Sequence, residues 1–195
     1  MVDIHPLWLL QKDSIMLIRP DDSALIVIDM QTRLVPAMLA PARTLKAAIL
    51  LVEAAQELQI PVLLTEQYPK GLGRTVPELK AAAENCPVFE KTHFSCMEDT
   101  QFATALRGLK RKQIVLAGME AHICVVQTAA SLLEDGFEVF VTSDATASRS
   151  ADSEQACLAR LSAAGVGIVT SEMVVFEWLG KAGTPAFKKM LPKIK

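Results

Sequence analysis

The stretch Ser-Ala-Leu-Ile-Val-Ile-Asp-Met-Gln, residues 23–31, decides the fold. Its five consecutive apolar residues, 24–28, do not alternate with polar ones. That pattern is typical of a strand buried on both faces of a parallel sheet. Asp29 follows directly. Because ligands bind beyond the carboxyl ends of parallel strands, this carboxylate lies where a ligand-binding or active site is expected.

Similar apolar runs recur along the chain. They predict strands at residues 24–29, 61–65, 87–91, 113–118, 138–143 and 167–170. Helical patterns occupy residues 42–59, 99–109, 121–135 and 151–164, with one or two short helices expected in 171–195. Residues 66–86, rich in glycine and proline, are expected to form a long loop. The alternation predicts an α/β fold: a three-layer, doubly wound, Rossmann-like parallel sheet of six strands in the order 3-2-1-4-5-6, with helices on both faces.

Length and composition exclude several classes of protein. The 195 residues suit one domain, residues 23–195, preceded by an N-terminal arm, residues 1–22. A net charge of -2 does not provide the positive electrostatic field expected of a protein that binds nucleic acid. No apolar stretch approaches the length needed to span a membrane. We therefore expect a cytoplasmic protein that binds a small molecule, and neither nucleic acid nor a membrane. The mean hydropathy of +0.29 is high for a monomer, so we expect a homo-oligomer.

The cysteines are expected to be reduced. Cys86, Cys96, Cys124 and Cys157 are scattered through a chain long enough to build its own core, which has no need of disulfides. We interpret Cys86 and Cys157 as packing residues.

Reactive side chains follow several of the predicted strands. Lys91 comes after Pro-Val-Phe-Glu, and Cys124 lies near the start of the helical pattern 121–135. The free amides and dipole of a helix start stabilise a thiolate, so a lowered thiol pKa is expected for Cys124. Asp29 is suited to take the proton of the Cys124 thiol as a base, and the positive charge of Lys91 would favour the thiolate. An acid, a base and a thiol in one pocket predict a cysteine hydrolase.

Each of these residues also has an ordinary explanation. A free cysteine is often a buried hydrophobe, and Asp29 would equally cap the segment after it. For Lys91, a solvated lysine at a strand end is the commoner case. Cys96, close to Lys91 in sequence, is a rival nucleophile. The residue pattern by itself leaves these alternatives open.

Several segments together resemble the isochorismatase-like cysteine hydrolase family. They are Ile-Val-Ile-Asp-Met-Gln (26–31), Phe-Glu-Lys-Thr-His-Phe-Ser (89–95) and Gly-Met-Glu-Ala-His-Ile-Cys-Val (118–125), in the family's order and spacing. Residues 66–73, 144–149 and 184–189 resemble its branch of isochorismatase domain-containing proteins.

The resemblance implies particular site residues. Asp29, Lys91 and Cys124 would form a catalytic triad. A cis peptide would join Met119 and Glu120, and backbone amides near Ala121 and Cys124 would form an oxyanion site. For substrate binding we expect Gln31, Tyr68, His93 and His122, although a structural histidine is the alternative for the last two.

No metal and no other cofactor is expected. Nicotinamidases of this family carry a metal-binding Asp-x-His and a later His after the second strand, where this chain reads Thr-Glu-Gln-Tyr-Pro-Lys-Gly-Leu-Gly. The three histidines, His5, His93 and His122, lack the spacing of zinc ligands.

The implied activity is hydrolysis of a small amide-like or related C–N substrate through a thioester on Cys124. Isochorismatase itself cleaves a vinyl ether and has this cysteine replaced, so Cys124 argues against that chemistry. The alternative is a catalytically weak interaction or scaffold protein that retains the hydrolase fold.

Overall fold

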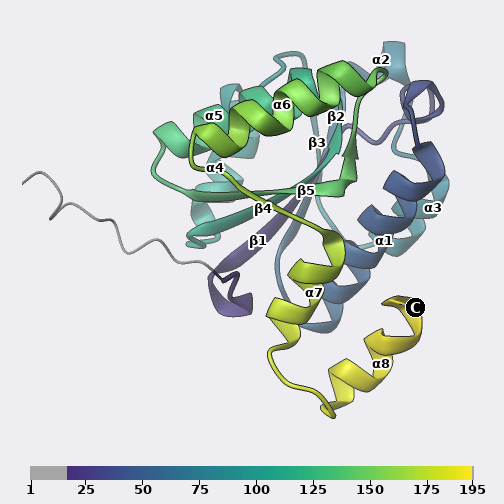
Figure 1. Cartoon of the computed structure of the whole chain (residues 1–195). Coiled ribbons are helices and arrows are strands. Elements are labelled where there is room, and N and C mark those ends of the chain that lie inside the picture. The colour runs from purple at the N-terminus through teal and green to yellow at the C-terminus, as the bar shows by residue number, and fades with distance from the viewer. Residues whose placement is uncertain (1–16, 195) are drawn as a thin grey trace, which may run out of the picture.

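The computed structural model describes residues 17–194 and contains a six-stranded parallel sheet (Figure 1). The strands are β1 (Ser23–Ile28), β2 (Val62–Gln67), β3 (Val88–Lys91), β4 (Gln113–Met119), β5 (Glu138–Ala147) and β6 (Gly167–Val169). Their order is β3-β2-β1-β4-β5-β6, so the direction of winding reverses between β1 and β4. The predicted α/β doubly wound fold is confirmed.

Eight α-helices connect and follow the strands in the described part of the chain. They are α1 (Pro41–Glu57), α2 (Pro69–Leu72), α3 (Pro77–Ala82), α4 (Thr100–Gly108), α5 (Val126–Glu134), α6 (Ala151–Ala163), α7 (Ser171–Leu179) and α8 (Pro185–Ile194). Short 3-10 turns span Pro20–Asp22, Val35–Ala37 and Cys96–Glu98, and a π-helical turn, Ala121–Val125, precedes α5.

The helices cover both faces of the sheet, as Figure 1 shows. Successive side chains of a strand point to opposite faces. Leu25 and Val27 of β1 therefore pack in the core with α1, α3, α7 and α8, whereas Ile26 and Ile28 pack in the core with α4, α5 and α6. Both faces of β1 are buried, which explains its unbroken apolar sequence.

The expected loop at residues 66–86 is wrong in part, because it contains the end of β2 and two short helices, α2 and α3. Both helices begin with a proline, Pro69 and Pro77. Proline breaks a helix in its interior but suits the first position, where the missing N–H has no partner to lose. The same residues that indicate a break therefore start these helices. Strand β5 also runs four residues beyond the predicted end at residue 143, to Ala147.

The predicted N-terminal arm falls mostly outside the described residues, since residues 1–16 are not described. Its last part lies against the body. The Ile18 N–H donates to Glu177 Oε2 of α7 at 2.7 Å, and the Arg19 N–H donates to Gln113 Oε1 of β4 at 2.7 Å. Within residues 17–194, no helix combines the length and the apolar character needed to cross a membrane.

Candidate active site

Asp29 lies immediately beyond β1, in an unusual backbone conformation. Its φ of 52° is in the left-handed region, which aspartate adopts more readily than most residues. Its N–H donates to Thr65 O of β2 at 3.2 Å, and its carbonyl accepts from the Gln31 N–H at 2.8 Å. Neighbouring β4 approaches closely here, because a Cβ on Gly118 would lie 2.0 Å from Ile28 O. Only glycine permits this approach, which brings the ends of β1 and β4 together.

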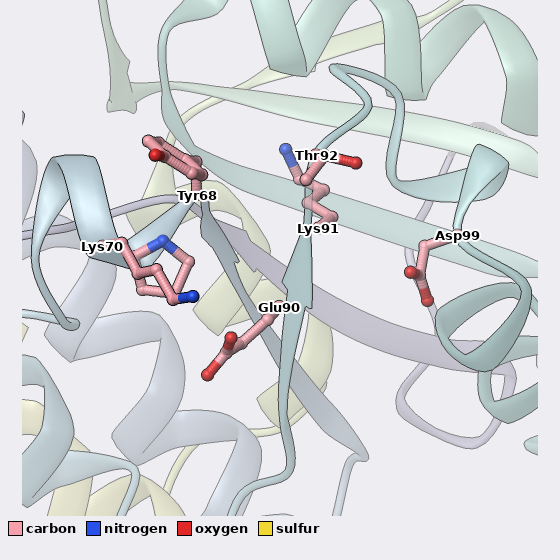
Figure 2. A pocket seen from close by; sticks show the side chains of 7 residues that line it. Tyr68, Lys70, Glu90, Lys91, Thr92 and Asp99 are labelled. Carbon is pink, nitrogen blue, oxygen red and sulfur yellow. The ribbon is translucent and has the colours of Figure 1, made fainter.

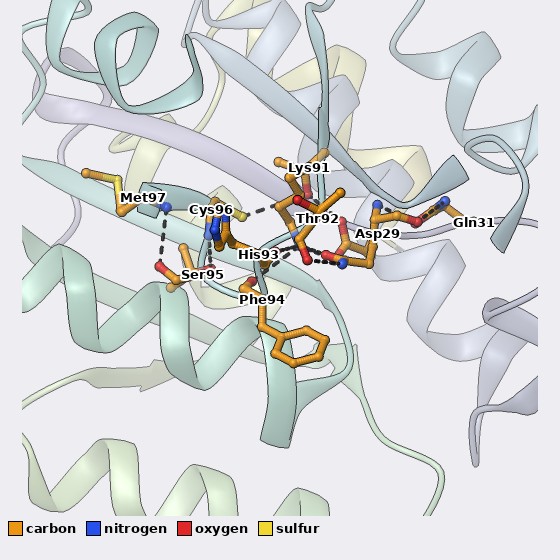
Figure 3. Close-up of polar contacts among 12 residues, drawn as sticks. Asp29, Gln31, Lys91, Thr92, His93, Phe94, Ser95, Cys96 and Met97 are labelled. Atoms are coloured by element: carbon orange, nitrogen blue, oxygen red, sulfur yellow. Dashed lines mark hydrogen bonds and ion pairs between the residues drawn. The ribbon is translucent and has the colours of Figure 1, made fainter. Parts of the chain in front are cut away.

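Lys91 is the last residue of β3, between Glu90 and Thr92 (Figure 2). Its Nζ donates to Asp29 Oδ2 at 2.7 Å and to Gln67 Oε1 at 2.6 Å. The Thr65 hydroxyl donates to the other carboxylate oxygen, Asp29 Oδ1, at 2.7 Å. Figure 3 shows Lys91 and Asp29 within the network of polar contacts. Both oxygens of the carboxylate are thus held by donors, one from β2 and one from β3.

The Lys91 ammonium is saturated by protein acceptors. Besides Asp29 and Gln67, it contacts the backbone oxygens of His93 and Phe94 at 3.3 Å each. An ammonium has three protons to donate, so none remains for a ligand. Burial alone would lower the pKa of Lys91, but the charge of Asp29 and the hydrogen bond to it raise this pKa above its ordinary value. Lys91 is therefore a permanent cation beside Asp29.

Cys124 lies in the π-helical turn between β4 and α5, close to Asp29, and is 5% exposed. Burial raises the pKa of this thiol far above its ordinary value; the Asp29 charge adds to the rise, and Lys91 opposes it. The expected lowering of the thiol pKa is therefore wrong for the free protein, because desolvation and the carboxylate outweigh the helix start. The resting thiol is protonated and needs a base.

Asp29 and Cys124 both line a cavity of about 350 Å³. Its other lining residues are Leu34, Ala37, Gln67, Leu72, Phe94, Glu120, Ile123 and Arg149. The lining is mainly apolar, and it contains one ion pair, from Arg149 Nε to Glu120 Oε2 at 2.8 Å. A mainly apolar cavity of this size with a few polar groups is typical of a small-molecule site.

The turn that carries Cys124 begins at a cis peptide bond between Met119 and Glu120. The N–H groups of Ile123 and Val125 donate to the Glu120 carbonyl at 3.1 and 3.2 Å. In the described structure, the N–H groups of Ala121 and Cys124 donate to no backbone acceptor outside this turn.

Gln31, for which substrate binding was expected, is not among the residues that line the cavity. Its side chain is fully buried. The amide nitrogen donates to Gln67 O at 3.0 Å and to Gly73 O at 2.6 Å, and the amide oxygen accepts from the Gln67 N–H at 2.8 Å. With donors and acceptor engaged by backbone, Gln31 holds the segment after β2 in place.

Tyr68 lines a different cavity, of about 370 Å³, shown in Figure 2. The other residues around it are Pro69, Lys70, Glu90, Lys91, Thr92 and Asp99. Tyr68 is 56% exposed, and its backbone has a φ of 37°. Tyr68 is not among the residues that line the cavity with the thiol.

The two histidines expected at the pocket line neither of these cavities. His93 is exposed, and its backbone carbonyl rather than its ring faces Lys91. His122 is half-buried, with Nδ1 at 2.9 Å from Ser148 Oγ. These contacts fit the structural alternative for His122.

Thr65, Gln67 and Arg149 also contribute to the site, although the sequence did not predict them there. Thr65 and Gln67 are polar residues at the carboxyl end of β2, directly after an apolar run, which is the signal that identified Asp29. Arg149 follows β5, whose true end was not predicted.

The rival nucleophile, Cys96, does not reach the cavity. It is fully buried, its Sγ lies 3.9 Å from Thr65 Oγ1, and burial raises its pKa to about 11. Between residues 17 and 194, no group of three or more His, Cys, Asp or Glu side chains is arranged to hold a metal ion.

Comparison with known proteins identifies the family and agrees with the fold. The Isochorismatase domain profile matches residues 23–173. The chain belongs to the isochorismatase family. Isochorismatase domain-containing protein 2 of Danio rerio is 39% identical over 168 residues, which cover 86% of this chain and 84% of the relative. The resemblance found in the sequence is thereby confirmed.

Solved structures share the fold of this isochorismatase-family chain. MAR1 ribonuclease from Caenorhabditis elegans matches with a TM-score of 0.86 and 39% identity, covering 91% of this chain and 92% of that one. YcaC from Pseudomonas aeruginosa, solved with hexane-2,5-diol and covalent acrylamide, matches with a TM-score of 0.87 and 25% identity, covering 92% of each chain.

Proposed function

We propose that the chain is a cysteine-dependent hydrolase of small amide-like or related C–N substrates, with Cys124 as nucleophile and Asp29 as its base. One observation carries the proposal: a buried Asp29–Lys91 ion pair beside a thiol, where carboxylate and thiol line the same small cavity. A base and a nucleophile placed together are the requirement of covalent catalysis.

The first half of the reaction forms a thioester. Asp29 takes the thiol proton as Cys124 Sγ attacks the carbonyl carbon, and the carbonyl π electrons move onto oxygen. Backbone N–H groups of Ala121 and Cys124 hold the resulting oxyanion. When the oxyanion collapses, the C–N bond breaks and the leaving nitrogen takes the proton from Asp29. Lys91 keeps Asp29 charged in the resting enzyme.

The second half returns the enzyme to its resting state. Asp29 takes a proton from water as the water oxygen attacks the thioester carbon. The C–S bond then breaks, and Cys124 recovers its proton from Asp29. The sum is amide plus water giving carboxylic acid plus amine, with no other reactant.

The lining of the cavity favours a small substrate over RNA, which the name of the C. elegans relative raises as a second candidate. Binding a phosphate backbone takes several cationic contacts. Arg149 is the cation among the cavity's lining residues, and its charge is already balanced by Glu120.

The proposal is tested with 4-nitrophenyl acetate and a panel of short primary amides, using nitrophenolate and ammonia release as readouts. We expect wild type to hydrolyse the ester and at least one amide, and Cys124→Ala to hydrolyse neither. A fluorescent RNA oligonucleotide is assayed in parallel. Cleavage of RNA by both proteins, with no Cys124-dependent hydrolysis, would overturn the proposal. The absence of Cys124-dependent hydrolysis with RNA intact would support the scaffold alternative.

A further inference from the structure

Cys157, interpreted from the sequence as a packing residue, contacts the turn that carries Cys124. It lies on α6 and is 4% exposed. Its thiol donates to the Ala121 carbonyl oxygen over a distance of 3.0 Å. Ala121 itself is fully buried. A thiol is a weak donor, yet this contact is short for a hydrogen bond that involves sulfur, and it is shielded from water.

The Ala121 carbonyl is held from two directions. The Val126 N–H donates to it along the axis of the π-helical turn, and the Cys157 thiol donates from the neighbouring helix. A carbonyl oxygen has two lone pairs, so both are used. The carbonyl of Ala121 and the N–H of His122 belong to one planar peptide unit. Fixing the direction of the oxygen therefore fixes the 121–122 peptide plane, which shares the Ala121 Cα with the peptide unit that carries the Ala121 N–H.

The thiol is suited to this task at neutral pH. Burial raises the pKa of Cys157 to about 11, so the sulfur keeps its proton and remains a donor. A thiolate there would instead repel the Ala121 oxygen. The substitution Cys157→Ala would leave the Ala121 carbonyl with the Val126 N–H as its remaining donor. The first peptide plane of the turn would then have one restraint fewer.

We propose that Cys157 is a positioning residue for hydrolysis: its hydrogen bond to the Ala121 carbonyl orders the backbone amides that hold the oxyanion. The inference rests on the proposed function, because it assumes that an oxyanion forms beside Cys124. Cys157 itself touches no reacting atom. Its loss acts through the geometry of residues 121–124, and not through the acidity of the nucleophile.

Two reagents separate these effects. Acetaldehyde adds reversibly to a thiol: a C–S bond forms and the thiol proton moves to the aldehyde oxygen, which occupies the place of the substrate oxyanion. Its dissociation constant reports how well the turn holds that oxygen. Methyl methanethiosulfonate transfers a methylthio group to the thiol and releases methanesulfinate. It has no carbonyl, so the rate of its reaction at Cys124 reports the reactivity of that thiol without any contribution from the oxyanion site.

The variants are Cys157→Ala, which removes the donor, and Cys157→Ser, which keeps one. Cys86→Ala, which removes a half-buried thiol far from the turn in sequence, is the matched control. We expect Cys157→Ala to bind acetaldehyde about tenfold more weakly. This is less than the roughly 10²–10³-fold fall in kcat that follows loss of an oxyanion donor itself. Cys157→Ser and Cys86→Ala should bind it as wild type does, and the methylthiolation rate should be the same in all four proteins.

Unchanged acetaldehyde binding in Cys157→Ala, or equal weakening in Cys157→Ala and Cys157→Ser, overturns the inference. If these variants do not fold, the S–H infrared band decides in a protein whose other cysteines, Cys86, Cys96 and Cys124, are serine. A band shifted to low frequency supports the hydrogen bond, and an unshifted band overturns it. Equal acetaldehyde binding by wild type and Cys124→Ala would instead mean that the proposed nucleophile is wrong, and the inference would fall with it.

Discussion

The Lys91 ammonium lies 2.7 Å from the Asp29 carboxylate, and 1% of the Lys91 side chain and 0% of the Asp29 side chain are exposed. Burying two charges costs desolvation energy that their attraction only partly returns, so such a pair adds little net stability. Removing one partner, however, leaves the other charge buried and uncompensated. The pair is better explained by the need for a charged carboxylate next to Cys124.

A double-mutant cycle tests this explanation. Lys91→Met and Asp29→Asn should each lower the free energy of unfolding by about 3–5 kcal/mol, because each leaves one buried charge alone. The double variant has neither charge and should recover most of that loss. Urea denaturation monitored by circular dichroism measures all four proteins. Single variants within about 1 kcal/mol of wild type, the range of exposed pairs, would contradict a buried ion pair.

The pH dependence of iodoacetamide labelling at Cys124 reports the thiol pKa. We expect a value above the free-cysteine value of about 8.5, because burial and Asp29 disfavour the thiolate. Since Lys91 favours the thiolate, Lys91→Met should raise the pKa further. Asp29→Asn should lower the pKa and yet stop turnover, because it removes the base.

Peptide mapping assigns this label to Cys124 rather than to Cys96. A wild-type pKa at or below the free value, or one that Asp29→Asn leaves unchanged, would show that the carboxylate does not act on the thiol.

The sheet and the proximity of Asp29, Lys91 and Cys124 could be predicted from the sequence for the same reason. Apolar runs mark buried strands, helical crossovers make the strands parallel, and parallel strands end on one edge of the sheet. Asp29, Lys91 and Cys124 follow or end three such runs, so their meeting depends on topology alone and not on detailed packing.

What could not be predicted depends on tertiary contacts. A lowered thiol pKa was expected for Cys124 from its place near a helix start, but burial and the charge of Asp29, a residue distant in sequence, raise that pKa. Asp29 and Tyr68 have left-handed backbone conformations, with φ of 52° and 37°. This conformation is uncommon for residues other than glycine, and the sequence pattern did not predict it at either position.

We expect the protein to act without a bound metal. Glu66, in the segment where nicotinamidases carry metal ligands, is paired with Arg74 at 2.9 Å and accepts from the Thr75 N–H at 2.7 Å. Elemental analysis should find less than stoichiometric zinc, manganese and iron, and EDTA should leave ester hydrolysis unchanged. Stoichiometric metal, whose removal abolishes hydrolysis, would refute this expectation.

The protein is expected to form a homo-oligomer. Leu39, Tyr68 and Phe94 are large apolar side chains with 54%, 56% and 52% of their surface exposed, which a partner copy would cover. Sedimentation at micromolar concentration should give a multiple of 21.2 kDa, and Phe94→Asp combined with Leu39→Asp should lower it. A wild-type species of monomer mass would count against the expectation.

The most direct test of the account is to trap the acyl-enzyme. Wild type, Cys124→Ala and Cys96→Ala are mixed with 4-nitrophenyl acetate, quenched in acid during the nitrophenolate burst, and analysed by intact and peptide mass spectrometry. If Cys124 is the nucleophile, we expect a single acetyl group on Cys124 in wild type and in Cys96→Ala. We expect neither an adduct nor turnover in Cys124→Ala. Acetylation of Cys96 instead, or sustained turnover by Cys124→Ala, would contradict it.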